Sequence, residues 1–297
     1  MTAATEPCYR GRFAPSPTGP LHFGSLIAAL ASFLDARHSG GSWLVRMEDL
    51  DPPREEKGAA RRILSSLQYH GLHWDEDVLF QSRRGDAYAA ALDELAAGGH
   101  LFSCDCTRAL LGPDGACRGR CRERQGQLAA PAATRVAVPP DTRIEFIDQV
   151  QGRIATDLGA HVPDFVVKRK DGLDAYQLAV VVDDAWQGVS HIVRGSDLLD
   201  STPRQVFLQR LLGYPTPGYC HIPVITDGGG QKLSKQNHAP PLDDHNAAAN
   251  LRAALAFLHQ REPPPALGTT GEILAFASRH WVPGRIPALL SIAAACP

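Results

Sequence analysis

Residues 15–24 of the chain are Pro15-Ser16-Pro17-Thr18-Gly19-Pro20-Leu21-His22-Phe23-Gly24, and an apolar stretch from Leu26 to Leu34 follows them. The prolines and the glycine predict a turn that joins the end of a strand to the start of a helix. Backbone N–H groups at a helix start have no partner within the helix, so such a turn favours a bound anion such as a phosphate. Because His22 lies in this turn, we expect its imidazole to face the same ligand.

A second stretch, Lys232-Leu233-Ser234-Lys235, follows Gly228-Gly229-Gly230. Two ammonium groups beside glycines predict a loop whose cations stabilise the charge that develops on a reacting phosphate. Each feature taken alone has a plainer interpretation, because a single histidine at a helix start is usually structural and a lysine-rich loop is usually surface. Their occurrence in one chain favours a nucleotide site.

Strand and helix patterns alternate outward from the first stretch. The sequence predicts strands over residues 9–14 and 42–47, and helices over residues 21–37, 52–67 and 87–97. This alternation is typical of an α/β protein with a doubly wound (Rossmann) nucleotide-binding fold.

After residue 100 the pattern changes to short strands mixed with cysteines and arginines. We expect strands over residues 134–138 and 143–147, and a hairpin in which residues 164–169 and 176–182 pair around Asp171-Gly172. The parallel sheet resumes at residues 191–193, followed by a helix that is capped by Ser201 or Thr202 and has Pro203 as its first residue. Further helices are expected over residues 247–258, 272–277 and 286–295.

These elements divide the chain into four parts. Residues 1–100 and 191–240 form the two halves of the Rossmann catalytic domain, the second half carrying the lysine loop. Residues 101–190 form an inserted subdomain with a candidate zinc site at residues 104–121. Residues 241–297 form a short helical C-terminal region.

The composition is that of a soluble globular protein, with 44% apolar residues and a net charge of −2. No apolar run is long enough to cross a membrane, and Met1 to Glu6 lack the pattern of a secretory signal, so we expect a cytoplasmic protein without a membrane partner. The net charge does not indicate a nucleic-acid partner. A local arginine cluster, which is as compatible with a solvated face as with RNA contact, comprises Arg108, Arg118, Arg120, Arg122 and Arg124.

Four cysteines lie close together in the sequence: Cys104, Cys106, Cys117 and Cys121. Disulfides are disfavoured in a cytoplasmic protein, and clustered thiols there are more often metal ligands. Four thiolates suit a tetrahedral, structural Zn²⁺. The alternative is four unpaired thiols with incidental spacing.

The two stretches resemble the HIGH and KMSKS signatures of class I aminoacyl-tRNA synthetases, and Arg12-Phe13-Ala14-Pro15-Ser16-Pro17-Thr18-Gly19 resembles the glutamyl branch of that family. The resemblance implies that His22, Gly24, Ser25 and Lys235 bind ATP, accompanied by Mg²⁺, and that His22, Lys232 and Lys235 act in catalysis. Two residues depart from the signatures, Ser25 in place of a second histidine and Gln236 in place of a final serine.

The same resemblance implies a pocket for L-glutamate, which carries two carboxylates and one ammonium. Arg12 and Arg194 are predicted at the carboxyl ends of parallel strands and suit the carboxylates, and Glu48 suits the ammonium. The remaining residues implied to bind glutamate are Phe13, Ala14, Pro15, Ser16 and Tyr176. The α-carboxylate would attack the α-phosphorus of ATP and form glutamyl-adenylate.

Only about sixty residues follow Lys235, which leaves no room for the anticodon-binding domain of glutamyl-tRNA synthetases. The chain in this respect resembles their short paralogues, the glutamyl-queuosine tRNA(Asp) synthetases. That family implies glutamate activation without tRNA, then transfer to the queuosine base in the anticodon loop of tRNA(Asp). We expect the protein to be a monomer.

Two alternatives remain open from the sequence. One is a short glutamyl-tRNA synthetase that charges the 3′ end of tRNA(Glu). The other is a catalytically inactive zinc RNA-binding module, which the altered signatures permit. Substitution of Lys235 by alanine would separate catalysis from binding.

Overall fold

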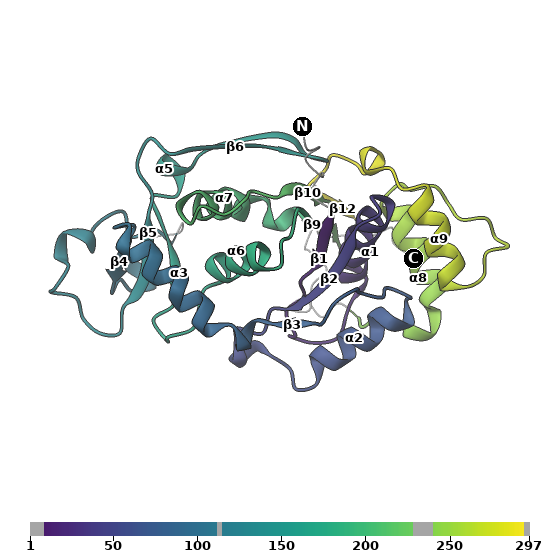
Figure 1. The fold of residues 1–297 in the computed structure, drawn as a ribbon, viewed down its shortest axis with the longest axis horizontal. Helices are drawn as coiled ribbons and strands as arrows, with labels where there is room; N and C mark the ends of the chain where they lie inside the picture. The colour runs from purple at the N-terminus through teal and green to yellow at the C-terminus, as the bar shows by residue number, and fades with distance from the viewer. Residues whose placement is uncertain (1–8, 112–114, 228–239, 294–297) are drawn as a thin grey trace, which may run out of the picture.

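A computed structural model describes residues 9–111, 115–227 and 240–293. Parallel strands occupy the middle of the elongated molecule (Figure 1). One sheet has the order β1-β2-β3, formed by β1 (Arg10–Phe13), β2 (Ser42–Met47) and β3 (Leu79–Phe80). A second has the order β7-β6-β10-β9, formed by β6 (Arg143–Asp148), β7 (Gly152–Asp157), β9 (His191–Gly195) and β10 (Gly218–Ile222).

The two sheets meet where β9 lies beside β1. The backbone N–H of Ser190 donates to the carbonyl of Arg10 at 3.0 Å. Strands β1, β2 and β3 are mutually parallel, as are β6, β9 and β10. The predicted doubly wound α/β fold is therefore confirmed.

Helices cover both sides of these strands. They are α1 (Phe23–His38), α2 (Ala59–Tyr69), α3 (Gly85–Ala97), α6 (Tyr176–Trp186), α7 (Thr202–Leu211), α8 (Ala247–Phe257) and α9 (Thr270–Arg279). One core joins α1 to β1, β2, α8 and α9, and a second joins α3, α6 and α7 to β6, β9 and β10. Helix α1 is buried from Leu26 to Ala36 apart from Ala28, which agrees with the mostly apolar sequence of this stretch.

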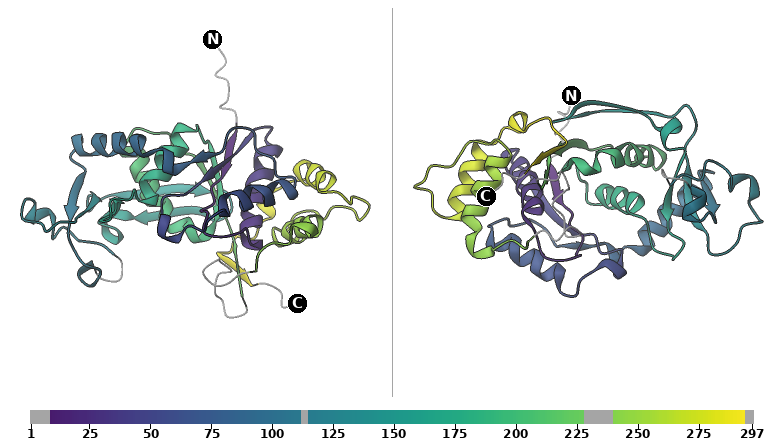
Figure 2. Two further views of the ribbon diagram at one scale, coloured as in Figure 1. Left: turned by 90° about the horizontal axis from the view of Figure 1, so that it is seen from below. Right: turned by 180° about the vertical axis from the view of Figure 1, so that it is seen from behind.

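The end of the molecule opposite α8 and α9 carries an antiparallel sheet of order β4-β5-β8 (Figure 1). It consists of β4 (Leu101–Cys104), β5 (Ala133–Ala137) and β8 (Asp164–Lys168), with short helices α4 (Arg108–Leu111) and α5 (Leu158–His161) nearby. From this end the hairpin β6–β7 runs back along the edge above α7 and pairs with β10 (Figures 1 and 2). The four-part division of the chain stays a prediction.

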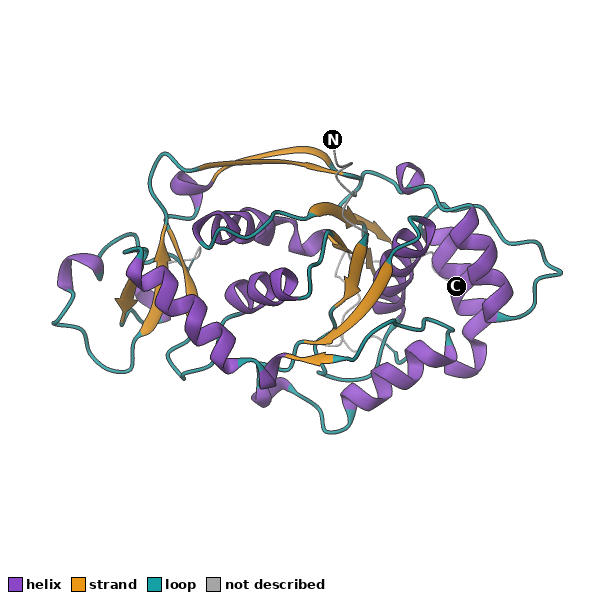
Figure 3. Ribbon diagram, in the orientation of Figure 1, coloured by secondary structure: helices purple, strands orange, loops and turns teal. Residues whose placement is uncertain are grey.

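The expectation of a strand over residues 176–182 is wrong, because these residues begin α6, drawn as a helix in Figure 3. The turn at Asp171-Gly172 exists, and Gly172 has a φ of +84°. After it the chain makes only one bridge, Lys168 with Asp174, before the helix starts. The run from Leu178 to Asp184 is buried throughout, and a fully buried helix cannot be told from a buried strand by periodicity. Three consecutive valines favoured the strand.

The expected helix over residues 286–295 is also wrong. Its residues Ser291–Ala293 form β12, which pairs in parallel with β11 (Val224–Thr226). The alanines favour a helix locally, but pairing with an available strand edge outweighs that preference. The expected helix over residues 52–67 is interrupted, since a 3₁₀ turn at Pro52–Arg54 is separated from α2 by Gly58, which has a φ of +78°. Within the described residues, no helix has both the length and the apolar character to cross a membrane.

Candidate functional site

A cavity of about 1040 Å³ opens at the carboxyl ends of β1, β2 and β9, beside the first turn of α1. Its wall brings together all the predicted site residues of the two ligands that the structure describes: Arg12, Phe13, Ala14, Pro15, Ser16, His22, Gly24, Ser25, Glu48, Tyr176 and Arg194. Lys232 and Lys235 lie outside the described residues. Residues as far apart in the sequence as Arg12 and Arg194 therefore face one space, as the carboxyl edge of a doubly wound sheet requires.

The turn before α1 is fixed to the end of β2. The backbone N–H of Glu48 donates to the carbonyl of Pro15, and that of Glu56 donates to the carbonyl of Pro17, both at 3.0 Å. His22 is the N-cap of α1, and its Nδ1 accepts from the backbone N–H of Ser25 at 3.3 Å. Since Nδ1 accepts, Nε2 carries the proton and donates to the Ser25 hydroxyl at 3.0 Å. Ser25, which replaces the second histidine of the signature, therefore contacts the first.

Gly24 keeps the cavity open beside this histidine. A Cβ at this position would lie 3.2 Å from the His22 ring and 3.2 Å from Ile225 of β11. Described residues that precede and follow the segment 228–239 also lie beside His22 and the cavity. Ile225 lines the cavity, and Pro241 forms a bridge with His22.

Arg12 and Arg46 share one buried carboxylate. Nε of Arg12 donates to Asp184 of α6 at 3.1 Å, and Nη1 of Arg46 donates to the same oxygen at 2.8 Å. Burial raises the pKa of the Asp184 carboxyl, but the pairing with Arg12 and Arg46 outweighs burial and leaves the pKa below its ordinary value. Nη2 of Arg46 lies 3.5 Å from Glu48, whose pKa is raised by burial.

Arg194 lies across the cavity from these groups, on β9. Its Nη2 donates to Thr202 and to Gln205, each at 2.8 Å, and its Nε donates to His221 at 3.0 Å. Nη1 makes only a long contact of 3.5 Å with the Tyr176 hydroxyl among the described residues. The guanidinium is thus held at Nε and Nη2, which leaves Nη1 as its least constrained nitrogen.

The charged groups of the site are paired to different degrees. Arg12 and Arg46 share Asp184, and Arg46 also lies beside Glu48. Among the described residues, the hydrogen-bond partners of Arg194 are hydroxyl groups, an amide oxygen and an imidazole, and none is a carboxylate. Its guanidinium therefore suits a ligand that carries a carboxylate.

Sequence reasoning missed Arg46 and Asp184. Arg46 is on β2, two residues before Glu48, which directly follows the strand. Because side chains alternate between the two faces of a strand, residues two positions apart point to the same side of the sheet. This signal was present in the sequence. Asp184 could not be assigned while residues 176–182, directly before it, were interpreted as a strand and not as the start of a helix that includes it.

The four clustered cysteines form a separate site. All four are buried, and their sulfur atoms lie within 4.8 Å of one another. Sγ of Cys106 is 3.9 Å from Cys117 and 3.4 Å from Cys121, close to the separation of about 3.8 Å that four thiolates have around one Zn²⁺. The donor set therefore fits a tetrahedral metal ion with no open position.

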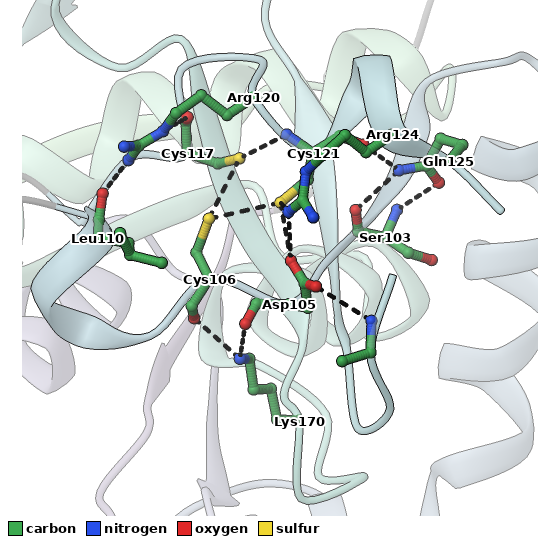
Figure 4. Close-up of polar contacts among 11 residues, drawn as sticks. Ser103, Asp105, Cys106, Leu110, Cys117, Arg120, Cys121, Arg124, Gln125 and Lys170 are labelled. Atoms are coloured by element: carbon green, nitrogen blue, oxygen red, sulfur yellow. Dashed lines mark hydrogen bonds and ion pairs between the residues drawn. The ribbon is translucent and has the colours of Figure 1, made fainter. Parts of the chain in front are cut away.

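Positive groups surround this cluster, as Figure 4 shows. Nη2 of Arg124 lies 2.8 Å from Asp105 and 3.5 Å from the sulfur of Cys121. Nζ of Lys170 donates to the carbonyls of Asp105 and Cys106 at 2.7 and 2.8 Å. The five arginines of the predicted cluster are all exposed, so they are accessible to a partner.

Residues 9–256 match the family of class I tRNA synthetases (E and Q), catalytic domain. The chain is 52% identical to the Glutamyl-Q tRNA(Asp) synthetase of Thiobacillus denitrificans, a match that covers 93% of this chain and 94% of that protein. It is 51% identical to the enzyme of the same name from Pseudomonas fluorescens, with 98% of each chain covered.

Solved structures of glutamate-tRNA synthetases share the fold. That of Elizabethkingia anophelis superposes with a TM-score of 0.77 at 22% identity, covering 97% of this chain and 68% of its own. That of Elizabethkingia meningosepticum, solved in complex with its amino acid, gives a TM-score of 0.74 at 23% identity, with 96% and 66% covered.

Proposed function

The chain belongs to the class I tRNA synthetases of the glutamate and glutamine group, and within it to the glutamyl-Q tRNA(Asp) synthetases. From this premise we propose that it activates L-glutamate with ATP, without need of tRNA, and transfers the glutamyl group to the queuosine base of tRNA(Asp). The observation that supports the site of this reaction is the placement of Arg12, Arg194 and Glu48 in one cavity beside the first turn of α1.

In our proposal Arg194 binds the side-chain carboxylate of glutamate through Nη1. Arg12 uses Nε and Nη2 for Asp184, so its Nη1 remains for the α-carboxylate. Glu48 binds the α-ammonium. A neutral side-chain amide carries no charge to pair with the Arg194 guanidinium, which disfavours glutamine.

The ATP phosphates would lie at the N-terminus of α1, where backbone N–H groups and the His22–Ser25 pair meet the cavity. An α-carboxylate oxygen of glutamate attacks the α-phosphorus in line, the bond to the bridging oxygen breaks, and pyrophosphate leaves. Lys232 and Lys235 are proposed from the sequence alone to neutralise the departing charge. An RNA hydroxyl then displaces AMP from the adenylate.

The four-cysteine site is proposed to bind one structural Zn²⁺, which would join β4 to the segment of residues 115–124. We further propose, from the sequence alone, that one chain is the functional unit. A tRNA substrate implies that the protein acts in the cytoplasm, and the exposed arginines from Arg108 to Arg124 are proposed to contact RNA phosphates.

The test of this function is glutamate-dependent ATP–pyrophosphate exchange with and without tRNA. We expect exchange without tRNA, followed by transfer of labelled glutamate to tRNA(Asp) that carries queuosine and not to tRNA(Asp) that lacks it. Exchange that requires tRNA(Glu) would instead indicate a short glutamyl-tRNA synthetase. Absence of exchange by a folded protein that binds RNA would indicate the inactive module.

The metal is tested by replacing one ligand. Purified protein is expected to contain one zinc per chain, and Cys117→Ser is expected to lose most of it, because a hydroxyl is a poor ligand for zinc in a thiolate site. Cys220→Ser is the matched control, since Cys220 is also buried and unpaired but lies on β10 away from the cluster. Metal analysis and the thiolate absorption of cobalt-substituted protein report the site directly. Full zinc content in Cys117→Ser would contradict the assignment.

A further inference from the structure

A chain of buried hydrogen bonds connects Arg194 to two residues that do not line the cavity, His221 and Asp148. His221 lies opposite Arg194 in the pairing of β9 with β10, and its Nε2 accepts from Nε of Arg194 at 3.0 Å. Nδ1 of His221 lies 2.6 Å from Oδ2 of Asp148. Both side chains are 0% exposed, so neither can contact a substrate directly.

The chemistry of the donors fixes the proton positions in this chain. An arginine only donates, so Nε2 of His221 must accept and Nδ1 must donate to Asp148. Burial lowers the pKa of His221 despite its hydrogen bond to Asp148, which favours the neutral ring that this arrangement needs. Asp148 is fixed in turn, because it accepts from the backbone N–H groups of Val150, Gln151 and His221 at 3.1, 2.9 and 3.1 Å.

We propose that Asp148 and His221 are positioning residues for Arg194, which orient its guanidinium so that Nη1 meets the side-chain carboxylate of glutamate. This inference rests on the proposed function of the cavity. Thr202 and Gln205, both on α7, hold Nη2, and neither of these hydrogen bonds involves Nε. The hydrogen bond from Nε to His221 of β10 holds the guanidinium at a second position. A binding group that is held in place before the ligand arrives loses less entropy on binding.

Asp148 also links the substrate site to the hairpin β6–β7. It is the last residue of β6, and this hairpin comes from the segment that the sequence predicts to be inserted into the Rossmann domain. The arginine of the proposed glutamate pocket is therefore oriented by a strand that would otherwise have no part in binding the amino acid.

The test compares His221→Leu, His221→Gln and Asp148→Asn in ATP–pyrophosphate exchange. His221→Leu is expected to raise the KM for glutamate about tenfold or more, as removal of an outer partner of a binding group typically does. The kcat and the KM for ATP should change less than about threefold, and the preference for glutamate over glutamine should fall. His221→Gln keeps an acceptor for Arg194 and is expected to recover most of the affinity.

His70→Leu is the matched control, because His70 is also 0% exposed and makes two hydrogen bonds, to Ser66 and Asn250, far from the cavity. It should lower the melting temperature without changing the KM for glutamate. If His221→Leu does not fold, Asp148→Asn decides, since it preserves shape and should still raise the KM. Exchange by the unsubstituted protein combined with an unchanged KM in these variants would overturn the positioning role alone. No exchange by the unsubstituted protein would contradict the proposed function and the inference together.

Discussion

Replacing Arg194 with methionine is expected to raise the KM for glutamate by about 10² to 10³. Truncating one member of a buried, hydrogen-bonded charge pair costs about 2–5 kcal/mol, and each 1.4 kcal/mol is a factor of ten. Arg194 is 4% exposed and three of its contacts are shorter than 3.1 Å, so a ligand carboxylate meets it without competing water. Glutamate titrations of pyrophosphate exchange at saturating ATP measure the effect.

Two further variants show whether the loss reflects carboxylate recognition. Arg194→Lys keeps the charge but has no planar guanidinium for Thr202, Gln205 and His221 to hold, so it should recover only a small part of the affinity. Arg153→Met removes an exposed arginine of β7 and should change nothing in the assay. An Arg194→Met protein with an ordinary KM for glutamate and a weakened KM for ATP would show that this arginine binds the nucleotide instead.

Much of the site follows from local sequence because it is built at the ends of parallel strands. Arg12, Glu48 and Arg194 each stand within two residues of the end of a predicted strand, and such positions meet at one edge of the sheet. The turn from Pro15 to His22 is equally local, since prolines and glycine determine its conformation. These residues could therefore be assigned to one cavity before any coordinates were known.

The residues that support the site could not be predicted in the same way. Asp184 faces Arg12 only because its segment is a helix, on which neighbouring Asp183 points about 100° away, toward Tyr88 and Arg84 of the α3 region. On a strand the two carboxylates would point to opposite faces. The expectation of a strand over residues 176–182, directly before them, thus hid the role of both.

Asp148 and His221 were hidden for a different reason. Their contact depends on how the hairpin β6–β7 pairs with β10, which is a long-range feature with no local signal. The strand β12 has the same character, because its partner β11 lies 67 residues earlier in the chain, as the pairing of Val224 with Ser291 shows. Pairings between distant segments are decided by tertiary packing, and the propensities of the residues involved do not encode them.

Replacing Asp184 with asparagine is expected to lower the free energy of unfolding by about 3–5 kcal/mol, because the substitution leaves two buried guanidinium groups without their carboxylate. Arg46 is 0% exposed and Arg12 is 3% exposed, so water cannot take the place of the lost charge. The expected fall in melting temperature is roughly 6–15 °C. Glu145→Gln is the control, since Glu145 pairs with exposed Arg143 and Arg153 and its loss should leave the melting temperature unchanged.

The dependence of this difference on pH identifies charge as its cause. The folded protein has a lowered pKa at Asp184, and the ordinary value is 3.8. A group with a lowered folded pKa contributes its stability above the unfolded pKa and loses it as the pH falls through the folded pKa. The gap in unfolding free energy between the original protein and Asp184→Asn should therefore be constant from pH 7 to about pH 5 and shrink below about pH 4. A gap of the same size at pH 3 would mean that shape and hydrogen bonding, and not the carboxylate charge, secure Arg12 and Arg46 beneath the cavity.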